Sequence, residues 1–491
     1  MIAVSKTDWW AVFFLCSVFA FRMLYAHFLG LVPDETYYWD WSREPAFGYF
    51  DHPPMIAWII FLSRQVFGET ALGVRAGVIA CSLVASLASY LIARKYVVKP
   101  SSLVFFLIMS NSILLFGVGS LLATPDIPLV LFWTCSFYFG YKALFEASTP
   151  SWIAMGLCAG LGLMSKYTFA LFFIAFVVLL VFSKPERRWL GRWQPYAAAL
   201  VSLVVWLPNL VWNAHHGWVS FLFQFSHGVN SKGGFRLDTL GEFIAGQLGI
   251  LSIFPFVLLL CAAAASLKDL RKGGRSAYLT LFFVVPFCVF LIASLQKKVE
   301  ANWAAAAYVS GLVMIARFWD NLDKASWAMK RFAIFSTVFA ALTTAVVLLH
   351  IQAPFLPLAP GNDPANQVLG WKEWAHDVDN IRNSLDHAEP LLICTNRYQE
   401  ASMLGFYLPD HPRTFALSLG ARENNYGLFQ ERRPRAFQKI IFIHPSGDPV
   451  SSPIFSETFL SIDLRSAATL YQGPRSSSVY NVYFATMRKS L

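Results

Sequence analysis

The sequence is poor in charged residues. Aspartate, glutamate, lysine and arginine together make up 14% of its 491 residues, whereas 56% are hydrophobic. This balance excludes an ordinary soluble protein and predicts a polytopic membrane protein. There is no P-loop, no glycine-rich dinucleotide motif and no internal repeat. Six of the seven cysteines lie inside apolar runs, so neither a disulfide framework nor a cysteine metal site is expected.

Acidic residues are outnumbered, and the net charge is +10. Nucleic-acid binding would fit such a charge, but the ordinary cause in a membrane protein is lysine and arginine in cytoplasmic loops. With a cytoplasmic N-terminus, one set of turns carries most of the basic residues: 94–99, 184–192, 268–275 and 324–331. The first loop and everything after about residue 352 are then expected outside the cytoplasm. The first apolar run is too long for a cleavable signal peptide.

The apolar runs predict about eleven transmembrane helices within a domain of residues 1–351. Residues 55–67 are too few to cross a bilayer and predict a re-entrant or interfacial helix. Residues 101–122 are expected to form one span, and the short pair 152–164 and 168–182 is the weakest assignment. The tail, 352–491, has soluble composition and predicts a small extracytoplasmic α/β domain. It should hold a helix at 396–408 and strands at 391–395, 414–419, 440–444 and 479–485.

Residues 33–54 form the most unusual loop of the chain. Acidic residues, a histidine and several aromatic rings gather there, directly after the first apolar run, 9–32. Desolvating carboxylates at a membrane surface costs free energy, so the acidic pair Asp34 and Glu35 needs a reason to be there. Aromatic rings at headgroup depth form amphipathic walls. The loop is therefore interpreted as the floor of an active site.

A second group of charged residues lies on the side that the topology rule would leave free of lysine. Lys166, Lys297 and Lys298 occupy very short turns on the side of the first loop, together with Asp126 and Glu300. A mixed-charge surface at one leaflet suits a reaction on a lipid phosphate, which needs lysine or arginine partners. We expect Lys166 and Lys298 to bind that phosphate together, and Lys297 to point to solvent.

Simpler structural roles compete with each of these assignments. Asp34, Glu35 and Asp126 each lie where an acid commonly caps a helix. Asp51 and His52 precede two prolines and could form only a rigid turn. Further structural alternatives are snorkelling for Lys166 and Lys298, a membrane anchor for Arg75, an aromatic wall for Tyr37 and Tyr38, and a helix cap for Asn396.

Six short motifs together resemble a known family. They are Asp34 with Glu35, the turn Tyr49-Phe50-Asp51-His52-Pro53-Pro54, Thr124-Pro125-Asp126, Ser165-Lys166-Tyr167, Lys298-Val299-Glu300-Ala301-Asn302-Trp303 and Asn396-Arg397-Tyr398-Gln399-Glu400. This set resembles the GT-C glycosyltransferases of the protein O-mannosyltransferase and lipid A aminoarabinose transferase superfamily. The resemblance covers nearly the whole chain without identifying one member.

The resemblance implies transfer of a sugar from a polyprenyl-phosphate donor to an acceptor outside the cytoplasm, usually with inversion. Asp34 matches the family's first-loop acid and would be the general base, and Glu35 would support it or bind acceptor. The aminoarabinose transferases carry a lysine where this chain has His52, which puts phosphate binding by that residue in doubt. The expected phosphate-binding residues are Lys166, Lys298, Arg75 and His52. The expected substrate-binding residues are Asp51, Asp126, Tyr37, Tyr38, Glu300, Asn302 and Arg397.

The expected acceptor is lipid A or core of lipopolysaccharide, at the periplasmic face of a Gram-negative inner membrane. Galacturonic acid, aminoarabinose and a hexose all stay open as the sugar, and Lys232 and Arg236 in the long outer loop favour an acidic or neutral one. Rival functions are protein O-glycosylation, a transporter or flippase, and a lipid-binding scaffold. No cofactor or metal is expected, although a carboxylate pair beside a phosphate could hold Mg²⁺. The expected partners are the donor, the acceptor and the bilayer, with no nucleic acid and a monomeric chain.

Overall fold

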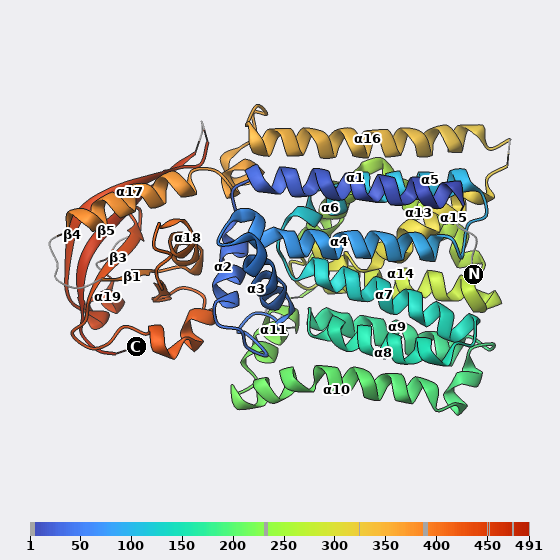
Figure 1. Ribbon diagram of the computed structural model, residues 1–491, viewed down its shortest axis with the longest axis horizontal. Helices are drawn as coiled ribbons and strands as arrows, with labels where there is room; N and C mark the ends of the chain where they lie inside the picture. The colour runs from blue at the N-terminus through green and yellow to red at the C-terminus, as the bar shows by residue number, and fades with distance from the viewer. Residues whose placement is uncertain are drawn as a thin grey trace.

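Long helices lie side by side in a bundle, and a sheet domain lies at the end of the bundle remote from the N-terminus (Figure 1). The computed structural model describes residues 5–229, 234–323, 325–385, 391–448, 450, 452–473 and 476–490. The α-helices of the bundle are α1 (Lys6–Phe28), α2 (Pro33–Ser42), α3 (Met55–Phe67), α4 (Ala71–Ala93), α5 (Pro100–Ser112), α6 (Leu114–Gly117), α7 (Asp126–Phe145), α8 (Thr149–Leu163), α9 (Ala170–Phe182), α10 (Gln194–His215), α11 (Val219–Val229), α12 (Leu237–Leu251), α13 (Ile253–Lys268), α14 (Gly274–Ala293), α15 (Ala307–Asn321) and α16 (Trp327–Gln352). Short 3₁₀ turns are η1 (Gly119–Leu121), η2 (Tyr167–Phe169), η3 (Arg187–Gly191), η4 (Leu270–Lys272), η5 (Ala301–Ala304), η6 (Pro360–Asn362), η7 (Pro364–Gln367), η8 (Asn425–Leu428) and η9 (Gln430–Arg432).

The bundle contains helices of two lengths. Seven of the described helices are long and apolar enough to cross a membrane, or eight if the bent pair α5 and α6 is one span. The count of eleven predicted from the sequence included shorter segments such as α8 and α9, which have 15 and 13 residues. A straight helix of that length covers only about 20 Å of a hydrocarbon core roughly 30 Å thick. The polytopic helical fold is confirmed, with fewer full-length spans than predicted.

The span expected at 101–122 is broken. Helices α5 and α6 meet at an angle of 73° around Ile113, whose backbone is extended. Asn111 donates to the carbonyl of Leu107 at 3.0 Å, and such side-chain bonds compete with helical ones. Arg22 of α1 donates to Asn111 at 3.3 Å and to the carbonyl of Phe116 at 2.7 Å. A cation from a distant helix therefore supplies hydrogen bonds at the break, which local sequence could not reveal.

Helices α2 and α3 lie at the end of the bundle that faces the sheet domain (Figure 1). Helix α3 spans Met55–Phe67, the bounds predicted for the short apolar segment. Helix α2 begins at Pro33, a residue that suits the first helical position because it has no amide hydrogen to leave unpaired. Almost all of α2 is buried, although its composition is polar and aromatic. Its burial indicates that it packs on both sides.

The tail forms one mixed five-stranded sheet with helices against it. The strand order is β2-β1-β3-β5-β4, with parallel pairing of β1 to β2 and β3 and antiparallel pairing of β5 to β3 and β4. Four predicted strands and the helix are present, and α17 and β4 were not predicted. The elements are α17 (Trp371–Ser384), β1 (Leu392–Thr395), α18 (Tyr398–Tyr407), β2 (Phe415–Ala416), β3 (Lys439–Pro445), α19 (Pro453–Thr458), β4 (Phe459–Tyr471) and β5 (Ser477–Met487).

The sheet domain is joined to α2 by a buried core and by ion pairs. Trp41 of α2 and Tyr426 of the tail belong to the same hydrophobic cluster. Arg432, only 4% exposed, pairs with Asp40 and Glu44, each at 2.6 Å. Breaking a buried pair of this kind by removing one partner costs about 3–5 kcal/mol. Residues of the tail are thereby held against the first loop, where the candidate site lies.

Candidate active site

Asp34 lies at the start of α2 and faces the tail domain. Val32, not Asp34, is the N-cap residue of the helix, so the capping alternative does not describe Asp34. The Asp34 carboxylate is exposed and accepts a hydrogen bond of 3.1 Å from the hydroxyl of Tyr398 on α18. An accessible carboxylate held by a residue of a second domain is suitably placed to act on a bound molecule.

The electrostatic surroundings of Asp34 favour its protonated form. Surrounding protein atoms raise the pKa of the carboxyl above its ordinary value, although the group is open to solvent. The Tyr398 hydrogen bond and the positive charge of Arg422 lower that pKa, and neighbouring Glu35 raises it. A carboxyl with a raised pKa is a better proton acceptor when ionised, as general base catalysis requires.

Glu35 and Arg75 form a sealed pair beneath α2. Both side chains are fully buried, and Nε of Arg75 donates to Oε1 of Glu35 at 2.7 Å. Glu35 also accepts from the amides of Val32 at 3.0 Å and Ala123 at 2.9 Å. Arg75 donates further to the carbonyls of Leu29 and Gly30, at 2.6 and 2.8 Å. The phosphate-binding role predicted for Arg75 is therefore corrected, because burial leaves none of its atoms available.

A second cluster gathers three of the predicted residues from separate elements. Nζ of Lys166 lies 2.7 Å from Oδ1 of Asp126, and Nδ2 of Asn302 donates to Oδ2 of Asp126 at 2.8 Å. Lys166 is 6% exposed and Asp126 is 9% exposed. Such burial does not fit the snorkelling alternative for Lys166. Burial and the charge of Lys166 lower the pKa of His52 to about 3, so that imidazole is neutral at physiological pH.

The second predicted lysine has a different setting. Lys298 is exposed and pairs with Glu300 at 3.2 Å, whereas Lys166 is buried beside Asp126. Lys297, predicted to point to solvent, is instead partly buried with its ammonium 5.7 Å from the ring centre of Trp303. The turn 297–300 thus presents Lys298, and not Lys297, to solvent.

Asp51 links the first loop to a tail arginine that sequence reasoning missed. Its buried carboxylate accepts the Tyr37 hydroxyl at 2.7 Å and pairs with Arg422. The Tyr37 oxygen in turn accepts the amide of Asn425 at 2.6 Å. Tyr38, the neighbouring ring, has a pKa raised by burial and by the negative charges of Asp34 and Asp126. Arg422 lies in an irregular segment far along the chain, and no local motif marks it.

The two predicted tail residues have different surroundings. Asn396 does not cap α18; its amide and carbonyl bond the backbone of Leu419, at 3.1 and 2.7 Å. These two hydrogen bonds anchor Leu419, three residues before Arg422. Arg397 is exposed and lies 3.7 Å from Asp448. In the outer loop Arg236 pairs with Asp238, and Lys232 lies outside the described residues.

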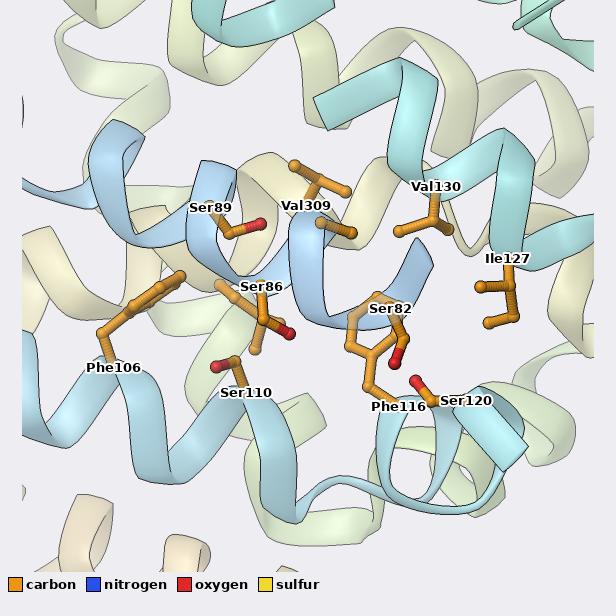
Figure 2. A pocket seen from close by; sticks show the side chains of 12 residues that line it. Ser82, Ser86, Ser89, Phe106, Ser110, Phe116, Ser120, Ile127, Val130 and Val309 are labelled. Carbon is orange, nitrogen blue, oxygen red and sulfur yellow. The ribbon is translucent and has the colours of Figure 1, made fainter. Parts of the chain in front are cut away.

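Two further features bear on cofactors and cavities. Across the described ranges, no three histidine, cysteine or acidic side chains are grouped to hold a metal ion. A separate cavity of about 40 Å³ lies inside the bundle. Figure 2 shows the side chains that line it. The hydroxyls around it belong to Ser82, Ser86, Ser89, Ser110 and Ser120, and its other lining residues are apolar. It contains no acid or base and is not a candidate for the chemistry.

The fold is that of a polytopic membrane protein with a sheet domain at one end of its helical bundle. Acidic and basic side chains gather at that end, and the sheet domain contributes Tyr398 and Arg422 to them, as in the active site of an enzyme. Residues 51–212 match the family described as dolichyl-phosphate-mannose-protein mannosyltransferase. This match confirms the resemblance, noted from the motifs, to the GT-C glycosyltransferases of the protein O-mannosyltransferase and lipid A aminoarabinose transferase superfamily.

Individual relatives and one solved structure are also similar to this chain. The chain is 28% identical over 287 residues to the lipid A galacturonosyltransferase RgtD of Rhizobium johnstonii, covering 57% of this chain and 59% of the relative. It is 27% identical over 367 residues to an undecaprenyl phosphate-alpha-4-amino-4-deoxy-L-arabinose arabinosyl transferase of Proteus mirabilis, covering 70% and 64%. The chain thus spans less than two thirds of each. The crystal structure of ArnT from Cupriavidus metallidurans bound to undecaprenyl phosphate has the same fold, with a TM-score of 0.67, 17% identity and coverage of 97% and 98%.

Proposed function

We propose that this protein transfers a sugar from a polyprenyl-phosphate donor to a hydroxyl group of lipid A or core lipopolysaccharide. The observation that carries the proposal is Asp34, an accessible carboxylate of raised pKa that bonds to Tyr398 of the tail. Relatives named for undecaprenyl phosphate and lipid A support the donor and acceptor classes.

The proposed mechanism is a single displacement with Asp34 as general base. The acceptor oxygen forms a bond to the anomeric carbon while its proton passes to Asp34. The bond between that carbon and the phosphate oxygen breaks, and its electron pair leaves with the lipid phosphate. One displacement inverts the anomeric configuration, and a positioned base contributes roughly 10²–10⁴ in rate. Glu35 supports α2 through Arg75 and takes no part in proton transfer.

The remaining residues divide between the two substrates in this proposal. Lys166, oriented by Asp126, faces the donor phosphate, and Asn302 fixes the same carboxylate. Neutral His52 offers hydrogen bonding and no charge. Glu300 and Arg397 are exposed and contact the acceptor, and Tyr37 and Tyr38 wall the site. No step requires a metal ion.

The site is proposed to face the periplasm of a Gram-negative cell, as the basic turns at the other side of the bundle favour by the positive-inside rule. The sugar is assigned as galacturonic acid, aminoarabinose or a hexose, and the chain acts as a monomer. Relatives named for galacturonic acid and for aminoarabinose have nearly equal identity to this chain, 28% and 27%.

Mass spectrometry of lipid A and core oligosaccharide, with and without the gene, tests the proposal. Loss of one sugar residue in the deletion strain, restored by the wild-type gene and not by Asp34→Asn, is the expected result. An unchanged lipopolysaccharide together with the loss of a glycan from periplasmic proteins would assign the chain to protein O-glycosylation. Accumulation of an untransferred lipid-linked sugar on the cytoplasmic side would instead indicate a flippase.

A further inference from the structure

The charges around Asp34 leave one cation with a distinctive setting. Lys166 and Asp126 are largely buried as a pair, Arg75 is sealed against Glu35, and the imidazole of His52 is neutral. Arg422 of the tail domain is 43% exposed, and its charge acts on Asp34 as well as on Asp51. Arg422 is thus coupled to two carboxylates of the first loop, Asp34 and Asp51, and lies where a negatively charged substrate would meet the base.

The guanidinium of Arg422 is held in a fixed orientation. Nη2 bonds Asp51, whose position is set by the Tyr37 hydroxyl at 2.7 Å. The guanidinium carbon lies 4.4 Å from the ring centre of Phe223 and 5.7 Å from that of Tyr398. Aromatic faces on a partly exposed guanidinium stabilise the charge and restrict its rotation. Little conformational freedom is then lost when Arg422 binds a ligand.

The guanidinium of Arg422 has hydrogen-bond donors that remain available to a ligand. Within the described ranges its hydrogen bonding is confined to Asp51 through Nη2, which leaves Nε and Nη1 available. Arginine presents its donors in a plane that matches two oxygens of a phosphate. Asn396 anchors the same segment to the base of α18 through Leu419, so the arginine and Tyr398 are positioned by one unit of the tail.

We propose that Arg422 binds the phosphate of the polyprenyl-phosphate donor, with Asp51 as the residue that positions it. This inference rests on the proposed glycosyl transfer and adds a phosphate ligand from the tail domain. As the bond to the anomeric carbon breaks, the departing phosphate oxygen takes the electron pair, and Arg422 stabilises the charge that develops there. The sheet domain thereby contributes directly to donor binding.

Binding of undecaprenyl phosphate and of uncharged undecaprenol to the full-length protein in nanodiscs tests this role. Arg422→Gln should weaken binding of undecaprenyl phosphate about ten- to a hundredfold, as expected for loss of a charge-assisted hydrogen-bonded partner, and should leave undecaprenol binding unchanged. Arg422→Lys should recover part of the affinity, because lysine keeps the positive charge but lacks the planar set of donors of the guanidinium. The matched control is Arg413→Gln, since Arg413 is also a tail arginine, 43% exposed, that pairs with an acid of the first loop, Glu44.

The outcomes separate this inference from the proposed function. A wild-type protein that neither binds undecaprenyl phosphate nor transfers a sugar would overturn the proposed function itself. Wild-type binding that Arg422→Gln leaves unchanged would overturn only the Arg422 assignment. A loss confined to the apparent KM of the acceptor would also overturn it and assign Arg422 to an acceptor phosphate. Equal losses for undecaprenyl phosphate and undecaprenol would show a merely structural role.

Discussion

The pair between Glu35 and Arg75 is predicted to stabilise the fold and not to act in the reaction. Both side chains are 0% exposed, so a single substitution strands a charge in the interior. Glu35→Gln and Arg75→Met should each lower the free energy of unfolding by about 3–5 kcal/mol, the usual cost of breaking a buried pair from one side. The double variant should lose less than the sum, because neither charge is then left alone.

Unfolding in mixed detergent micelles, followed by circular dichroism, measures these differences. Glu146→Gln is the matched control, since its pair with Lys95 is partly exposed and should contribute only about 0–1 kcal/mol. Transfer per folded molecule should stay close to wild type in Glu35→Gln. Wild-type stability combined with strongly reduced turnover in that variant would refute the structural assignment and give Glu35 a catalytic role.

Two further predictions concern proton transfer and donor binding. Tyr398→Phe removes a hydrogen bond that lowers the pKa of Asp34, so the pKa of Asp34 should rise. The acidic limb of the kcat/KM–pH profile should then move to higher pH. An acidic limb that stays in place would contradict the assignment of Asp34 as the base. Lys166→Met should weaken binding of undecaprenyl phosphate about ten- to a hundredfold by removing a buried cation. Lys298→Met should change the affinity for undecaprenyl phosphate about threefold or less, because Lys298 is exposed beside Glu300 and surface pairs contribute little. Equal losses in the two lysine variants would show that both lysines bind the phosphate.

The fold was predictable where one segment determines its own structure. Helix α3 matches the predicted segment because its apolar residues end at Gly68, a residue with positive φ. The break at Ile113 was not predictable, because its hydrogen bonds come from Arg22 on another helix. Strand β4 was missed because most of its side chains are exposed, so it lacks the buried alternation that marks a strand in sequence.

The candidate site was predictable as a set of residues and only partly as a set of contacts. Motifs in the first loop drew attention to Asp34 and Asp51, and topology drew attention to Lys166. The partners of these residues come from elsewhere in the chain: Asp126 lies 40 residues from Lys166, and Arg422 lies 371 residues from Asp51. The first pairing depends on how α7 and α8 pack in the bundle, and the second on how the tail docks on the first loop. No local pattern encodes either arrangement.

Reconstituted sugar transfer tests the central claim most directly. Purified wild type, Asp34→Asn and the control Asp410→Asn, whose carboxylate is exposed on the tail, would be placed in liposomes with lipid A and an undecaprenyl-phosphate-linked sugar. Wild type and Asp410→Asn should transfer one of the three candidate sugars, with product detected by mass spectrometry. Asp34→Asn should be slower by roughly 10²–10⁴ while still binding undecaprenyl phosphate. Near-normal turnover by Asp34→Asn, or no transfer by wild type with any of the three sugars, would contradict the account.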